Sequence, residues 1–112
     1  NHSLSAAESA QVSELLHTLS DFERMGDYSV NISESASILH DRGISFTDAA
    51  QRELSALTDA VGEALDKTLE CYTNRSRELA FQVEPLEEVV DLLRDELKNR
   101  HIERFKIGAC TI

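Results

Sequence analysis

Two carboxylates one helical turn apart are the residues of this sequence best suited to chemistry. Glu23 and Asp27 stand four positions apart in a segment with helical apolar spacing, so both would project from one face of a helix. At about 100° per residue they fall between Leu19 and Val30, in the arc expected to face a core. Buried carboxylates lose hydration and repel each other. The pair therefore needs a cation, a basic neighbour, a raised pKa or a water-filled groove.

Metal binding is one way to meet this need. Carboxylates at i and i+4 can supply oxygen ligands to a hard cation or to a metal cluster. Asn31 and Glu34 extend the same polar edge and are second-tier metal candidates. The alternative is structural, because a kink or register change at Gly26 would turn both acids toward solvent. The residue pattern leaves the two interpretations open.

A second acidic group stands near the start of the last helical segment. Glu84, Glu87, Glu88 and Asp91 follow one another closely there, and a helix dipole favours acids in a first turn. Glu87 and Asp91 lie at the border of the apolar stripe rather than on it. The pattern by itself favours a solvated edge for them.

Three helices, at about 5–40, 46–80 and 84–105, are predicted to position these acids. Ser5 and Glu8 form a capping box, Gly43 can provide a left-handed cap, and Pro85 suits a first helical turn. Apolar residues spaced three or four apart fill the segments, and no segment alternates as a strand would. Short connections favour antiparallel neighbours. The predicted fold is an all-α, elongated antiparallel three-helix bundle.

Composition limits the function further. The 112 residues fit one domain, 1–112, and the net charge of −10 argues against nucleic acid as a partner. The two cysteines make neither a metal-binding spacing nor a disulfide framework, which suits a reduced cytosolic setting. No apolar run reaches the roughly 20 residues of a membrane span, so direct membrane insertion is not expected. No catalytic motif appears, and we predict a protein that is not an enzyme.

The segment 20–32, which contains both Glu23 and Asp27, resembles the signature of the PhoU family of phosphate-transport regulators. Its Glu-x-x-x-Asp pair has a companion in Glu87 and Asp91. The resemblance implies a helical bundle in which the two pairs face each other across the first and third helices and bind a divalent or trivalent metal ion or a metal cluster. Residue 28 is Tyr where the family usually has His.

A closer resemblance is to the C-terminal cytoplasmic PhoU-like domain of bacterial sodium/phosphate cotransporters. It rests on the stretches 15–18, 83–87 and 100–104 and on the tail 108–112. This resemblance implies a regulatory domain on the cytoplasmic side of the bacterial inner membrane, with the transporter membrane domain as its partner. Two alternatives remain: a purely structural helical interaction domain with solvated acids, and a free-standing PhoU-like regulator of phosphate uptake.

The resemblance also implies that the chain is a fragment of a larger helical domain, because flanking helices of the transporter domain are missing. An incomplete bundle leaves an apolar groove open, and such patches usually mark an interface. We therefore predict a homo-oligomer formed through the apolar face of the second helix, which carries Phe46, Leu54, Leu57, Val61 and Leu65.

Overall fold

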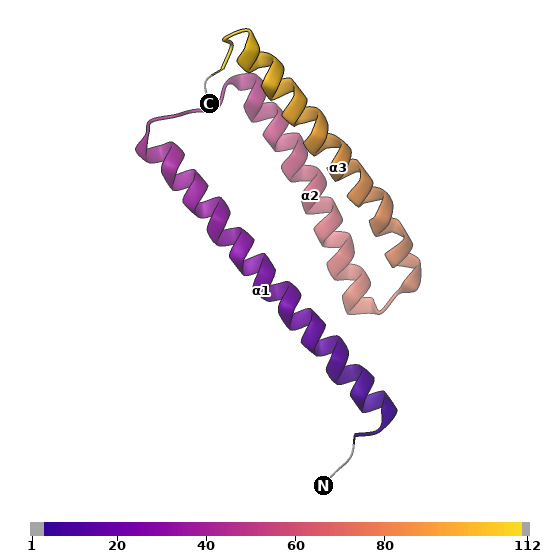
Figure 1. Ribbon diagram of the computed structural model, residues 1–112. Helices are drawn as coiled ribbons and strands as arrows, with labels where there is room; N and C mark the ends of the chain where they lie inside the picture. Colours follow the sequence, from indigo (N-terminus) through magenta and orange to yellow (C-terminus); the bar gives the residue numbers. More distant parts are fainter. Residues whose placement is uncertain (1–3, 111–112) are drawn as a thin grey trace. The chain divides into compact units, whose positions relative to one another are not determined.

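The computed structural model describes residues 4–110, which form three α-helices and no strand (Figure 1). These are α1 (Ala6–Asp41), α2 (Asp48–Asn74) and α3 (Arg77–Lys106). The predicted all-α fold class is confirmed. Residues 1–3 and 111–112, and with them the last two residues of the tail used above, lie outside the described residues.

The chain divides into two compact units, one up to Ser45 and one from Phe46 onward. The first unit contains α1, and the second contains α2 and α3. The packing of the first helix against the other two remains a prediction from the sequence.

Both ends of α1 follow the predicted capping chemistry. The Ser5 side chain accepts a hydrogen bond from the Glu8 backbone at 3.3 Å, and the Glu8 carboxylate accepts one from the Ser5 backbone at 2.8 Å. At the other end Gly43 adopts φ 63°, a left-handed conformation that costs glycine little. Its N–H donates to the His40 carbonyl, and the next N–H reaches Leu39. This Schellman motif satisfies the last carbonyls of the helix.

The boundary between the second and third helices was predicted wrongly. We expected one helix to run to about 80 and the next to open at Pro85, but α2 ends at Asn74 and α3 begins at Arg77. Arg75 turns the chain with a left-handed φ of 50°. The hydroxyl of Ser76 then accepts the Leu79 N–H at 3.3 Å and caps α3. A serine cap outweighs the propensity for continued helix in this segment.

Pro85 therefore lies inside α3 rather than in its first turn. Because proline has no N–H, the carbonyl of Phe81 loses its i+4 helical donor there. An interior proline costs a helix about 3 kcal/mol in an isolated setting, so packing against α2 has to offset it. The acids that follow Pro85 consequently lie in the body of α3 and not in its first turn.

Helices α2 and α3 lie side by side as an antiparallel hairpin (Figure 1). No described side chain is completely buried, but half-buried positions recur at heptad-like spacing on both helices. This is the spacing of helices that pack along a common seam. The seam consists of Glu53, Leu57, Ala60, Ala64, Lys67 and Cys71 on α2 and of Leu79, Val83, Leu86, Val90, Leu93, Leu97 and Arg104 on α3.

A second apolar stripe, which begins at Phe46 just before α2 and continues along that helix, stays largely exposed within the hairpin. Its large side chains are between 39 and 49% exposed. Of the face predicted for self-association, only Leu57 is half-buried in the seam, while the others are exposed. None of the described helices is both long and apolar enough for a membrane span. The exposed stripe consists of Phe46, Leu54, Val61, Leu65 and Tyr72.

Candidate functional site

The first acidic pair, Glu23 and Asp27, lies on α1, which continues through Gly26 without a break. Both side chains are exposed within the first unit, and helical geometry sets them one turn apart. The break that would have turned them away is absent from this part of the described chain, so they share a face with Leu19 and Val30 as predicted. Like charges at this spacing destabilise a helix slightly unless a cation lies between them.

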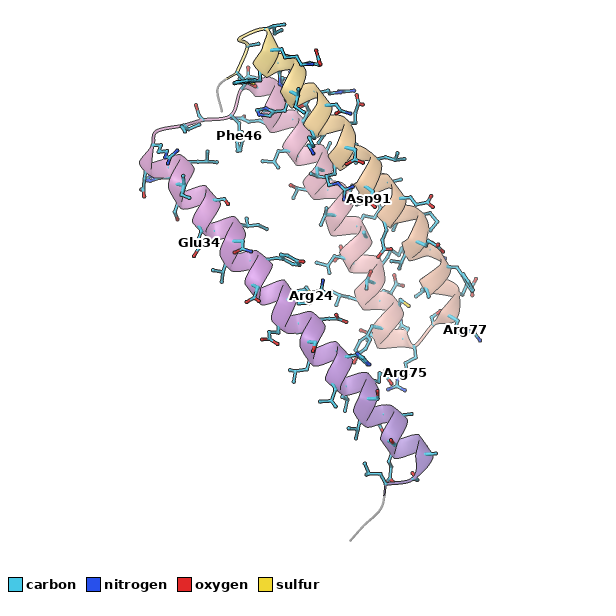
Figure 2. The ribbon with its side chains drawn as sticks, in the orientation of Figure 1. Arg24, Glu34, Phe46, Arg75, Arg77 and Asp91 are labelled. Atoms are coloured by element: carbon cyan, nitrogen blue, oxygen red, sulfur yellow. The ribbon has the colours of Figure 1, made fainter. Side chains whose placement is uncertain are left out.

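The second-tier residues Asn31 and Glu34 follow on the same helix and are also exposed. Arg24 and Glu34 both project from α1 in Figure 2. The backbone carbonyl of Asn31 accepts a hydrogen bond from the Ser35 hydroxyl at 2.8 Å, and the amide side chain of Asn31 takes no part in that bond. An amide oxygen remains a usable ligand for a hard cation. Their metal role stays a prediction.

The second acidic pair, Glu87 and Asp91, borders a hollow between α2 and α3. The hollow has a volume of about 410 Å³. Both acids are exposed at its rim, and Asp91 accepts a hydrogen bond from the Arg94 guanidinium at 2.7 Å. The pair is thus solvated, as the sequence pattern favoured, but it stands beside an apolar surface of α2. The lining residues are Val61, Ala64, Leu65, Thr68, Glu87, Val90 and Asp91.

The two acidic pairs belong to different units of the chain. Among residues 4–110, no group of three or more His, Cys, Asp and Glu side chains gathers to hold a metal. The two carboxylates of one pair offer at most four oxygen atoms, fewer than the six to eight oxygen ligands of a calcium-like site. The donor chemistry fits a hard cation. That the two pairs share an ion is a prediction from the family resemblance.

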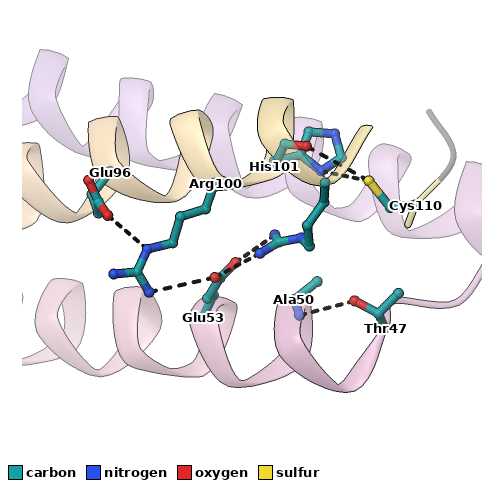
Figure 3. Close-up of polar contacts among 8 residues, drawn as sticks. Thr47, Ala50, Glu53, Glu96, Arg100, His101 and Cys110 are labelled. Carbon is teal, nitrogen blue, oxygen red and sulfur yellow. Dashed lines mark hydrogen bonds and ion pairs between the residues drawn. The ribbon is translucent and has the colours of Figure 1, made fainter. Parts of the chain in front are cut away.

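An ion pair that sequence analysis missed joins the ends of the hairpin. The Arg104 guanidinium donates to both oxygens of Glu53, at 2.8 and 2.6 Å (Figure 3). Their side chains are only 19 and 16% exposed. Hydrogen bonding to Arg104 is the main reason that the pKa of Glu53 is lowered, against the opposing effect of burial. Such two-point pairs are the stronger class of charged hydrogen bond.

Arg100 adds a second cation to this cluster. It lies 3.9 Å from Glu53 and donates to Glu96 at 2.8 Å (Figure 3). One signal could have revealed the cluster from sequence. Glu53 precedes Leu57 by four residues, and Arg104 follows Leu97 by seven, so each is a charge on the seam. Opposite charges at seam positions of neighbouring helices predict an ion pair.

These observations define an antiparallel helical hairpin with acids beside its seam, and comparison with known families assigns it. The PhoU domain family model matches residues 54–109, which are 56 of the 112 residues, or half of the chain. The chain belongs to the PhoU family. The match covers most of α2 and all of α3, including Glu87 and Asp91, whereas the segment 20–32 lies outside it. No curated protein and no solved structure matches the chain.

Proposed function

We propose that this chain is the regulatory, metal-binding PhoU-like domain of a bacterial sodium-dependent phosphate transporter. Membership in the PhoU family connects it with the regulation of phosphate transport. The transporter membrane domain would be its partner and would hold it on the cytoplasmic side of the inner membrane. It acts by binding rather than by catalysis.

The resemblance to transporter-linked domains supports the finer assignment. Two of the three stretches that carry it, 83–87 and 100–104, lie in α3 inside the matched residues. The stretch 83–87 contains both the interior proline, Pro85, and Glu87, the first residue of the second acidic pair. The stretch 100–104 contains Arg104 of the hairpin ion pair.

The observation that carries the metal role is the position of Glu87 and Asp91 at the rim of one hollow. Glu23, Asp27, Glu87 and Asp91 would hold the ion, with Asn31 and Glu34 at the margin. A divalent or trivalent cation would neutralise carboxylates that otherwise repel one another. These four acids are among the 21 acidic side chains that give the chain its net charge of −10.

Metal content of the purified chain tests this proposal. The chain is dialysed against a mixture of divalent and trivalent cations at micromolar concentration and analysed by mass spectrometry of the elements. We expect bound metal at or above one ion per chain. The Glu87→Gln/Asp91→Asn variant should lose it, and Asp27→Ala should weaken binding by about tenfold or more.

The matched control is Glu84→Gln/Glu88→Gln, which removes two charges at the same spacing on the same helix. It should bind metal as the original chain does. Equal loss in both double variants would mean that general negative charge, and not a site, attracts the ion.

The structural alternative has one observation in its favour: Arg94 already pairs with Asp91, whose side chain is 66% exposed. Under that alternative all four proteins bind metal only at background level. The full-length reading frame distinguishes a free-standing regulator from a domain fused to a transporter. A hydrophobic transporter core encoded in the same reading frame would establish the fused form.

A further inference from the structure

Another exposed apolar face of the hairpin lies on α3. Phe81 and Leu92 are 72 and 71% exposed, and Pro85 between them is exposed as well. At about 100° per residue these three side chains fall within one narrow arc of the helix. The half-buried seam residues Leu86 and Val90 lie on roughly the opposite side, so packing against α2 does not cover this arc. We call Phe81, Pro85 and Leu92 the outer face of α3.

Carboxylates flank the outer face. Glu88 lies between Pro85 and Leu92 in the same arc, and Glu78 and Glu84 border it on either side. All three acids are exposed. Within residues 4–110 none of them forms an ion pair or a side-chain hydrogen bond. Their charges can therefore pair with a binding partner at no loss of an existing contact.

This half of α3 is strongly acidic. From Arg77 to Leu92 the helix contains five acids and one base. Exposed apolar surface with a polar rim is typical of an interaction site, and the carboxylates would repel an anionic lipid surface. The outer face fits a partner that presents apolar side chains and positive charge together. A basic amphipathic helix has this combination.

We propose that the outer face of α3 docks a Lys- and Arg-rich amphipathic segment on the cytoplasmic side of the transporter membrane domain. The choice of this partner rests on the function proposed above. Cytoplasmic segments of membrane proteins carry an excess of Lys and Arg, which complements the acids around the outer face. Phe81 and Leu92 contact the apolar side chains of the segment, while Glu84 and Glu88 pair with its cations.

The test measures the binding of a synthetic amphipathic helix, made only of Leu and Lys, to the whole chain by calorimetric titration. A peptide of Leu and Glu with the same pattern has the same apolar side chains and the opposite charge. We expect the Leu/Lys peptide to bind, with an affinity that falls as salt is added, and the Leu/Glu peptide not to bind. Binding of both peptides alike, or of neither, would overturn the proposal.

A pair of variants locates the apolar part of the surface. Phe81→Gln/Leu92→Gln should weaken binding of the Leu/Lys peptide by about tenfold or more. Leu54→Gln/Val61→Gln removes two exposed side chains from the stripe of α2 and should leave the affinity unchanged. Circular dichroism checks that both variants remain folded. Equal losses in the two variants would mean that the peptide does not distinguish the outer face from the stripe, which would overturn the proposal.

The charged part is tested with the two double variants used for metal binding. Glu84→Gln/Glu88→Gln should weaken the Leu/Lys peptide by about fivefold and keep the metal. Glu87→Gln/Asp91→Asn should lose the metal and keep the peptide. Equal weakening of the peptide in both would overturn the docking surface. Absence of metal binding together with the expected peptide results would overturn the metal proposal alone, so the two failures are distinguishable.

The source of the segment is tested separately. Lys- and Arg-rich cytoplasmic segments encoded in the full-length reading frame, made as peptides, should rank the variants as the Leu/Lys peptide does. A reading frame without a transporter core would overturn this choice of partner together with the proposed function. Light scattering tests a second copy of the chain as the occupant. A mass of two chains that falls to one in Phe81→Gln/Leu92→Gln would assign the outer face to that copy and overturn the proposal.

Discussion

Glu53 and Arg104 are 51 positions apart in the sequence and joined by two hydrogen bonds, so the beginning of α2 is held to the end of α3. The turn at Arg75 and Ser76 closes the other end of the same hairpin. Between these two contacts runs the half-buried seam, in which aliphatic and small side chains predominate. Polar contacts thus stabilise both ends of the hairpin, and an apolar contact lies between them.

Replacing Glu53 tests the ion pair at the end of the hairpin where α2 begins and α3 ends. Glu53→Gln keeps the shape of the side chain but removes the charge that Arg104 faces, and the guanidinium is left poorly satisfied. We expect the thermal midpoint to fall by roughly 5 °C. Glu96→Gln is the control, because that carboxylate is 55% exposed and pairs with Arg100. An equal fall in both variants, measured by circular dichroism, would contradict a special role for Glu53.

The same ion pair predicts a pH dependence. Arg104 lowers the pKa of Glu53, so the unfolded chain binds this proton more readily than the folded one. The stability from the pair is complete above the unfolded pKa of about 4.3 and is lost as the pH falls through the lower folded value. The difference in midpoint between the original chain and Glu53→Gln should be constant near neutral pH and disappear once the pH has fallen below the folded pKa of Glu53. A difference that persists there would contradict this origin.

A substitution at Ser76 tests the helix cap at the turn between α2 and α3. Ser76→Ala removes the hydroxyl that accepts the Leu79 N–H and should cost about 1 kcal/mol in the free energy of unfolding. Ser55→Ala, inside α2, should have no effect or stabilise slightly, because alanine has the better helix propensity. Urea unfolding of the two variants gives the comparison. A neutral Ser76→Ala would show that Arg75 alone fixes the turn.

The sequence predicted the helices but not the register between two of them. Spacing and caps identified α1 almost to the residue, because Ser5, Glu8 and Gly43 act locally. The turn after α2 was missed because Pro85 offered a stronger helix-start signal than Ser76. Moving the turn toward Pro85 shifts every pairing across the hairpin. Glu53 and Arg104 lie at recognisable seam positions, but they do not face each other under that register, so their ion pair was missed.

The candidate acids show the same division between local and long-range information. That Glu23 and Asp27 share a face follows from the helix period alone and agrees with the continuous α1. The hollow beside Glu87 and Asp91 depends on Ala64, Leu65 and Thr68 of another helix. No pattern within α3 carries that information. The interior position of Pro85 also removes the first-turn explanation for these acids.

Arg94 provides a further test of the metal proposal, because its guanidinium already forms an ion pair with the Asp91 carboxylate at 2.7 Å. A cation that binds Asp91 has to compete with this exposed ion pair. Arg94→Ala should therefore tighten divalent-metal binding by about two- to fivefold. Lys98→Ala, four residues further along α3, is the control for lost positive charge. Equal gains in both variants, measured by calorimetric titration, would indicate a general electrostatic effect and not a site at Asp91.

The last prediction concerns self-association through the exposed stripe of α2. Leu54, Val61 and Leu65 are 46, 45 and 39% exposed, on the face that the seam with α3 leaves open. A two-fold contact between two such stripes is self-complementary, and it would place Val61 of each chain near its own copy. Val61→Glu would set two like charges there and should return the chain to a monomer. Ser55→Glu adds the same charge at a polar position elsewhere on α2 and should not. Light scattering over a concentration series measures the mass of all three proteins. A mass of one chain for the original protein throughout the micromolar range would mean that the stripe is covered within the chain.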